Sequence, residues 1–212
     1  TEAIEASIKL ARRITGKSQI IAMKKAYHGN TMGSLSLMDY EERKAPFRPL
    51  IPDITHINFN CLQDLKFITQ DAAAVIIESI QGGAGFKIPS NLWMQQLSKR
   101  CKETDTLLIV DEIQPGVGRT GSMFYFTQHH IVPDMVVTGK GLAGGLPIGA
   151  LTTSKEHMSY FKEEPMLGHI TTFGGHPVIA AAALATLTEI ERGGYLEQMS
   201  RKEGHFRDNL QH

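Results

Sequence analysis

The chain has 212 residues, of which 42% are hydrophobic and 21% are charged, and its 22 basic side chains equal its 22 acidic ones in number. These proportions are those of a globular chain with a sizeable core, and they exclude a disordered one. The zero formal charge argues against a protein that binds nucleic acid or an anionic membrane. No apolar run approaches the ~18 residues of a membrane span.

The two cysteines, Cys61 and Cys101, lie 40 positions apart and show no paired spacing. This argues against a disulfide framework or a thiolate zinc site and fits a reducing compartment, so we expect a cytoplasmic protein. The chain opens on a predicted helix, without an initiator methionine or a signal peptide. We therefore expect an excerpt of a longer protein. An organelle-targeting segment upstream of it is the open alternative to a cytoplasmic location.

Apolar periodicity predicts helices and strands in alternation along the chain. The first helix covers 2–15, with Thr1 at its N-cap and Gly16 at its end. Strands are predicted at 18–23, 72–79, 106–112, 133–140 and 146–154. Further helices are predicted at 91–105, 176–192 and 202–212, and loops at 27–34 and 46–52.

Buried apolar strands that alternate with helices predict a layered α/β fold, with a sheet covered on both faces. Ligands of such folds bind beyond the carboxyl ends of the strands. Asp111, Glu112, Gln114 and Lys140 all fall at these ends. The sequence therefore predicts a functional site at this edge of the sheet.

Lys140 lies between two glycines at the end of an apolar strand, where partial desolvation favours its neutral, nucleophilic amine. An exposed loop lysine is the simpler alternative. Asp111 ends the strand LLIVD and could bind a metal, orient a histidine or pair with a buried cation, unless it is a helix cap or a surface acid. Gln114 could supply a directional amide donor.

Tyr27 and His28 stand in a glycine-flanked loop, where an aromatic ring can stack on a planar ligand or simply pack. The glycines of GKGLAG match a dinucleotide-binding spacing, but strand-like residues follow instead of a helix, so we interpret the match as accidental. No phosphate-binding P-loop motif is present. The pair His129–His130 lacks the spacing of metal ligands, and we predict no metal site.

Six segments follow one another over nearly the whole chain: TEAIEASIKLAR, KKAYHGNTMG, IIESIQGGAG, LIVDEIQPGVGRTG, VTGKGLAGGLPIGA and HITTFGGHPVIAAAAL. In content and order they resemble the motifs of the class III, pyridoxal-phosphate-dependent aminotransferases. The 29 residues from Asp111 to Lys140 also match the interval in that family. The resemblance implies a three-layer α/β/α fold with a mixed, mostly parallel seven-stranded sheet. Residues 1–212 would form its cofactor-binding large domain, with the small-domain segments lying before and after.

The resemblance also implies roles for the residues at the sheet edge. Lys140 would hold pyridoxal 5′-phosphate as an internal aldimine and, once freed by substrate, would move the proton. Asp111 would pair with the pyridinium nitrogen, and Gln114 would reach the phenolic oxygen of the ring. Tyr27 would stack on the ring, with His28 nearby.

Further implied roles concern the phosphate and the substrate. Thr1 would bind the phosphate at a helix N-terminus, and Thr172 would reach the phosphate of a neighbouring subunit, which requires a homodimer with shared active sites. Asn30 and Thr171 are expected on the substrate side. Asn30 stands where acetylornithine-type members carry an arginine, and Gly83 where ornithine-type members carry a glutamate.

The function implied is transamination from an amine or ω-amino acid, such as ornithine or acetylornithine, to a 2-oxo acid such as 2-oxoglutarate. An aminomutase or a decarboxylating transaminase on the same scaffold is the first alternative. A non-catalytic domain of a larger assembly is the second.

Overall fold

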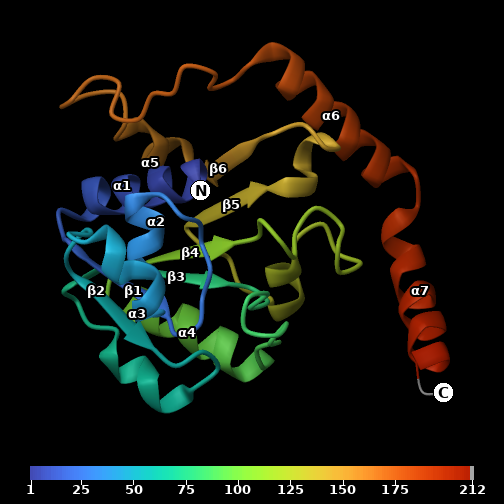
Figure 1. The fold of residues 1–212 in the computed structure, drawn as a ribbon, viewed down its shortest axis with the longest axis horizontal. Coiled ribbons are helices and arrows are strands. Elements are labelled where there is room, and N and C mark those ends of the chain that lie inside the picture. The colour runs from blue at the N-terminus through green and yellow to red at the C-terminus, as the bar shows by residue number, and fades with distance from the viewer. Residues whose placement is uncertain (211–212) are drawn as a thin grey trace.

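Six strands form one sheet in the computed structural model, which describes residues 1–210 (Figure 1). The strands are β1 (Gln19–Met23), β2 (Ile54–Ile57), β3 (Ala72–Glu78), β4 (Leu107–Asp111), β5 (Met135–Gly139) and β6 (Gly149–Thr153). The helices are α1 (Glu2–Thr15), α2 (Met32–Ser36), α3 (Glu41–Lys44), α4 (Asn91–Glu103), α5 (Lys155–Ser159), α6 (Pro177–Arg192) and α7 (Tyr195–Leu210). Short 3₁₀ helices are η1 (Ala45–Phe47), η2 (Leu62–Phe67), η3 (Tyr125–His129) and η4 (Lys140–Ala143).

The strands lie in the order β2-β1-β3-β4-β5-β6, and all neighbours are parallel except β5 and β6. The predicted mixed, mostly parallel sheet is confirmed. It has six strands within residues 1–210 rather than seven, because no strand pairs with the outer edge of β6 there. The sequence analysis also missed β2, which lies at the opposite edge of the sheet.

Most predicted element boundaries agree with the structure. Helix α1 covers the predicted range, with Gly16 in the left-handed conformation at its end. Part of the predicted loop 27–34 is helical, since α2 begins at Met32. The last helix begins at Tyr195, earlier than predicted, and the predicted positions 211–212 lie outside the described residues.

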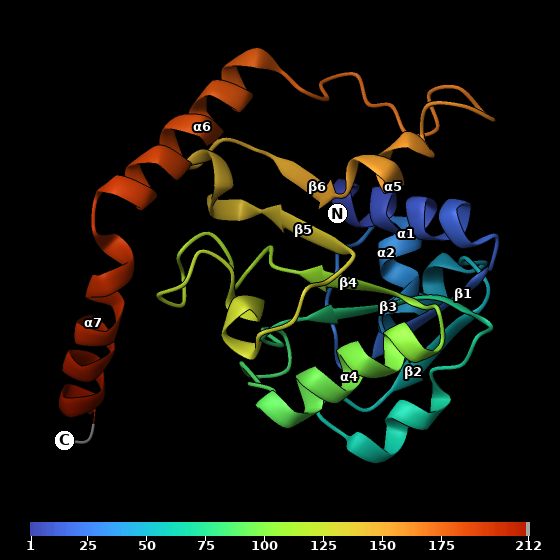
Figure 2. The same ribbon diagram turned by 180° about the vertical axis from the view of Figure 1, so that it is seen from behind.

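Apolar side chains pack on both faces of the sheet, because successive residues of a strand point to opposite sides. On one face, Ile4 and Ile8 of α1 pack in one buried cluster with Ile76 of β3. On the other face, Trp93 of α4 lies in a second cluster with Ile77. Figures 1 and 2 show α1 and α4 on opposite sides of the sheet, which confirms the predicted three layers.

Helices α6 and α7 extend beyond the layered core. Ala183 of α6 packs with Leu142 of η4 in a small third cluster, and α7 then runs down one side of the molecule (Figures 1 and 2). Apolar side chains remain exposed on α6, among them Val178 at 63% and Leu184 at 68%. Their exposure leaves an apolar surface on this side of the described chain.

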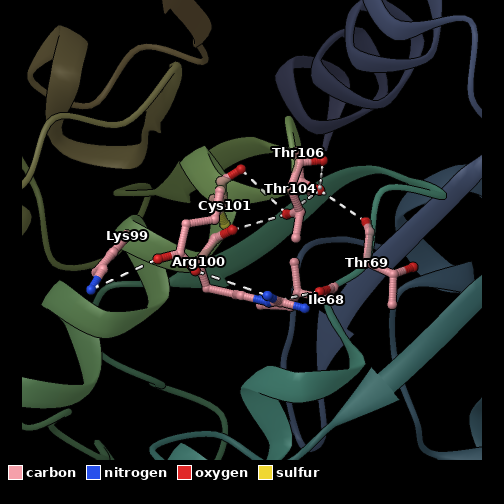
Figure 3. A network of polar contacts seen from close by, with 8 residues as sticks. Ile68, Thr69, Lys99, Arg100, Cys101, Thr104 and Thr106 are labelled. Atoms are coloured by element: carbon pink, nitrogen blue, oxygen red, sulfur yellow. Dashed lines mark hydrogen bonds and ion pairs between the residues drawn. The ribbon is translucent and has the colours of Figure 1, made fainter.

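A threonine network joins the end of α4 to the start of β4 (Figure 3). The Thr104 hydroxyl donates to the Arg100 carbonyl at 2.9 Å and lies 2.9 Å from the Thr106 hydroxyl. Thr106 in turn donates to the Thr69 carbonyl, and the Arg100 Nε donates to the Ile68 carbonyl. These bonds fasten α4 to the turn before β3 at the end of the sheet away from the strands' carboxyl ends.

We expect Thr104→Val to lower the free energy of unfolding by about 1 kcal/mol, because it removes a hydroxyl that is hydrogen-bonded and 4% exposed. Chemical denaturation of the intact protein measures the change. Thr127→Val is the matched control, since the exposed Thr127 hydroxyl also donates to a carbonyl, that of Phe124, but water can replace it. Equal losses for both variants would contradict the role of the buried network.

Candidate active site

A pocket lies at the edge of the sheet where β3, β4 and β5 end. Its volume is about 280 Å³, near the lower limit of roughly 300 Å³ for small-molecule pockets. The sequence-predicted residues that line it are Thr1, Tyr27, His28, Asp111, Gln114 and Lys140. The structure therefore brings together residues from four separate segments. The strand-end argument predicts this for Asp111, Gln114 and Lys140, and the family resemblance implies it for Thr1, Tyr27 and His28.

Asp111 and His28 form a buried pair in this pocket. The Asp111 Oδ2 lies 2.7 Å from the His28 Nδ1, and the Asp111 Oδ1 accepts the Ile113 N–H at 2.9 Å. Both residues are nearly inaccessible, with Asp111 3% exposed and His28 2% exposed. An ionised carboxylate offers about four acceptor positions, so Asp111 retains capacity for another donor.

Lys140 follows β5 directly and its side chain lines the same pocket. Lys140 is exposed in the described chain, so the expected partial desolvation is not found, and its Nζ has no hydrogen-bond or ion-pair partner among residues 1–210. Its backbone φ of 41° lies in the left-handed region, which is uncommon for a residue with a side chain. Backbone conformations of this kind gather at functional sites.

Thr1 and Tyr27 also line this pocket. The Thr1 side chain makes no capping bond to α1, and its hydroxyl lies against Gly29, where a Cβ would overlap it. Gly29 has a φ of +128°, so its lack of a side chain is needed for conformation and for space. Tyr27 is 40% exposed, and its Oη accepts a 3.3 Å bond from Asn30, which does not itself line the pocket.

Gln114 reaches the pocket from the loop after β4. Its side chain packs against Gly82 so closely that a Cβ on Gly82 would overlap the amide. The backbone at Gly82 thus limits the positions open to Gln114.

Thr171 and Thr172 line a different cavity of about 820 Å³, which adjoins the first pocket through shared residues Ile148 and Gly149. The structure therefore does not bring these threonines into the pocket that holds Lys140. Thr172 is exposed to solvent in the described chain. Their predicted roles toward substrate and a neighbouring cofactor stay predictions.

Two further acids are buried at the same edge: Glu78, which the sequence analysis missed, and Glu112, which it places at this edge without a role and which does not line the pocket. Glu78 ends β3 and lines the pocket, and burial raises the pKa of its carboxyl group. Glu112 accepts backbone N–H bonds from Tyr125 and Phe126 of η3, and burial raises its pKa as well. Glu78 shows the same sequence pattern as Asp111, an acid at the end of a buried apolar strand, and this pattern could have identified it.

The structure also bears on other classes of site. Among residues 1–210, no three His, Cys, Asp or Glu side chains gather closely enough to hold a metal ion. No helix in that range has the length and apolar character needed to cross a membrane.

Comparison with known proteins places these features in a family. The sequence model of the family Aminotransferase class-III matches residues 1–212. A [LysW]-aminoadipate semialdehyde/glutamate semialdehyde transaminase from Sulfolobus acidocaldarius is 41% identical over 99% of this chain. An acetylornithine aminotransferase from Listeria innocua is 40% identical over 100% of it. The chain spans 54% of the length of each of these relatives.

Solved structures agree with the sequence relatives. An ornithine aminotransferase from Toxoplasma gondii, whose active site is partly occupied by pyridoxal phosphate, superposes with a TM-score of 0.92 at 29% identity. The match covers 99% of this chain and 51% of that one. A family match over the whole sequence, with relatives at least 40% identical, shows that this chain belongs to the class-III aminotransferases, a family that depends on pyridoxal 5′-phosphate.

Proposed function

We propose that this protein transfers an amino group from an amine or ω-amino acid to a 2-oxo acid, with pyridoxal 5′-phosphate bound through Lys140. One observation carries the proposal: the unpaired Lys140 amine and the buried Asp111–His28 pair line the same pocket at the carboxyl edge of the sheet. An amine and a paired acid in one pocket are the groups that this cofactor needs.

The residues of the pocket fit the cofactor. Within residues 1–210 the His28 Nε2 is buried without a hydrogen-bond partner, and Asp111 retains acceptor capacity, so a ligand with a polar ring would complete them. Thr1 at the N-terminus of the 14-residue α1 suits a phosphate, because free N–H groups and the helix dipole favour an anion there. Tyr27 presents a partly exposed ring that could stack on a planar ligand.

When bound, pyridoxal 5′-phosphate supplies an aldehyde for covalent attachment and a ring that takes up the electron pair released by deprotonation. Lys140 would hold the group through Nζ and, as a free amine, would accept a proton at the substrate carbon that bears the amino group and later return it. The Asp111 carboxylate would favour the protonated ring nitrogen, and His28, 2.7 Å from it, would orient Asp111. Gln114 would serve as a donor to the phenolic oxygen of the ring.

The relatives support the substrate class. Their names indicate acetylornithine and the semialdehydes of aminoadipate and glutamate, so an ornithine-like or acetylornithine-like donor is proposed here. A 2-oxo acid such as 2-oxoglutarate is the proposed acceptor. Asn30 and Thr171 are proposed on the substrate side, and the contact between Asn30 and Tyr27 is the support for the first of them.

The assembly is part of the proposal. Residues 1–212 act as the cofactor-binding large domain of a homodimer with shared active sites, in which Thr172 reaches the cofactor phosphate of the partner subunit. The exposed position of Thr172, in a cavity beside the Lys140 pocket, supports this arrangement. A cytoplasmic location is also proposed, supported by two free cysteines.

The direct test is to record the visible absorbance of the intact protein with pyridoxal 5′-phosphate, then to reduce it with borohydride and map the labelled peptide. We expect a visible band and a label on Lys140. Free cofactor with no label would sink the proposal and favour a non-catalytic domain. Carbon dioxide or an isomerised product in a donor screen would replace transamination by decarboxylation or amino-group migration.

Lys140→Ala should abolish covalent attachment and reduce turnover by roughly 10²–10⁴-fold or more, the contribution of a positioned acid–base group. The measurement is borohydride labelling together with steady-state turnover. Lys155→Ala is the control, because Lys155 is an exposed lysine at the start of α5. Turnover of Lys140→Ala at the wild-type rate would rule out the assigned role.

Asp111→Asn should leave the cofactor bound but slow proton removal by roughly 10²–10³-fold, as the loss of one preorganised electrostatic group does elsewhere. The physical reason is that a neutral amide no longer favours the charged ring nitrogen. A solvent-exchange or single-turnover experiment isolates this step. Proton removal at the wild-type rate would show that Asp111 is structural only.

A further inference from the structure

We infer that Glu78 is a positioning residue of this site, whose carboxylate ties together the two loops that carry Tyr27 and Gly82. The inference rests on the proposed function and extends it to a residue outside the assigned machinery. Glu78 is the last residue of β3, is 4% exposed and lines the pocket. A carboxylate buried to this degree requires hydrogen-bond donors, and the identity of its donors indicates what it does.

Both oxygens of Glu78 are occupied by backbone amides from different loops. Oε2 accepts the Tyr27 N–H at 3.1 Å, and Oε1 accepts the Gly82 N–H at 3.3 Å. Tyr27 belongs to the loop after β1, whereas Gly82 belongs to the loop after β3. A single side chain therefore fixes the separation of two loops that are 55 residues apart in the chain.

Each of these loops holds a residue that is proposed to contact the cofactor ring. Tyr27 lines the pocket, and the bond from its backbone N–H to Glu78 restrains the position of its aromatic ring relative to the pocket. Gly82 packs directly against the Gln114 side chain, so a shift of Gly82 would move that amide. Through two bonds, Glu78 thus controls the positions of Tyr27 and Gln114.

The two N–H donors require the ionised form of Glu78, although burial disfavours that form. Glu78 lies beside Asp111 in the sheet register, and His28 is the nearby cation when protonated. Burial is the main cause that raises the pKa of Glu78, and the Asp111 charge adds to it, while His28 and the Tyr27 and Gly82 amides oppose it. A protonated carboxyl would present a hydroxyl donor to one of two N–H donors, so only one bond would remain.

The test compares Glu78→Gln with Glu112→Gln in the intact protein. Glutamine has one acceptor oxygen, so each variant loses one of two bonds from backbone amides. Glu112 is the matched control because it is fully buried at the next position after β4, and its donors, Tyr125 and Phe126, do not line the pocket. Thermal unfolding should show comparable destabilisation of the two variants.

Cofactor binding should separate the variants. We expect Glu78→Gln to raise the dissociation constant of pyridoxal 5′-phosphate for the apo-protein by roughly tenfold, the effect of one lost charge-assisted hydrogen bond. Its visible circular dichroism should weaken, because the Tyr27 ring no longer holds one position. Glu112→Gln should keep wild-type values for both. If Glu78→Gln also keeps them while the wild type labels on Lys140, the inference is wrong and the proposed function stands.

A measurement without any variant covers the case in which Glu78→Gln does not fold. Amide hydrogen exchange of the wild-type apo-protein should show slow exchange at the Tyr27 and Gly82 N–H groups, which lie in loops but are bonded to a buried acceptor. Exchange at the rate of exposed loop amides would overturn the inference. A wild type that binds no cofactor at Lys140 would overturn the proposed function and this inference together.

Discussion

Parallel pairing between β3 and β4 is the constraint on which the candidate site depends. It places the last residue of each strand at the same edge, so that Glu78 and Asp111 are register partners. Both faces of these parallel strands are covered by the apolar faces of amphipathic helices, α1 on one side and α4 on the other. The carboxyl edge is the part of the sheet where polar groups can gather at the rim of the core.

Three acids are buried at this edge, and each is satisfied by donors that differ from those of the others. Glu78 and Glu112 take backbone amides, whereas Asp111 takes a histidine and one amide. Burying a charge is costly unless it is paired or hydrogen-bonded, so each acid imposes a geometry on the loop that satisfies it. Buried carboxylates therefore help to fix the loops around the pocket, whereas α1 and α4 pack on the sheet through buried apolar clusters.

Much of this arrangement can be predicted from the sequence, because buried parallel strands appear there as continuous runs of apolar residues. Residues 72–78 show such a run and were predicted almost to the residue. The strand β2 was missed because Ile54–Ile57 is only four residues long, lies at the edge and buries only Ile57 fully. Local pattern carries little signal for a short edge strand, whose pairing with β1 is decided by the rest of the sheet.

The candidate site, like the fold, was predictable from sequence only in part. Strand ends predict that Asp111 and Lys140 lie at the same edge of the sheet, and both line one pocket there. Nothing in local sequence indicates that the Glu78 carboxylate would accept an amide from the loop after β1, because that contact forms only when distant segments fold together. The placement of Thr171 and Thr172 in a neighbouring cavity could not be predicted from local sequence either, since it depends on the course of residues 160–176 between α5 and α6.

The left-handed backbone at Lys140 has a consequence for the history of such chains. Glycine or asparagine tolerates that conformation better than lysine does, so the backbone by itself does not favour a lysine there. If Lys140 binds the cofactor as proposed, a related chain that no longer performs the reaction should keep its apolar strand residues but not this amine. A residue other than lysine at position 140 would then mark a chain that has lost the reaction.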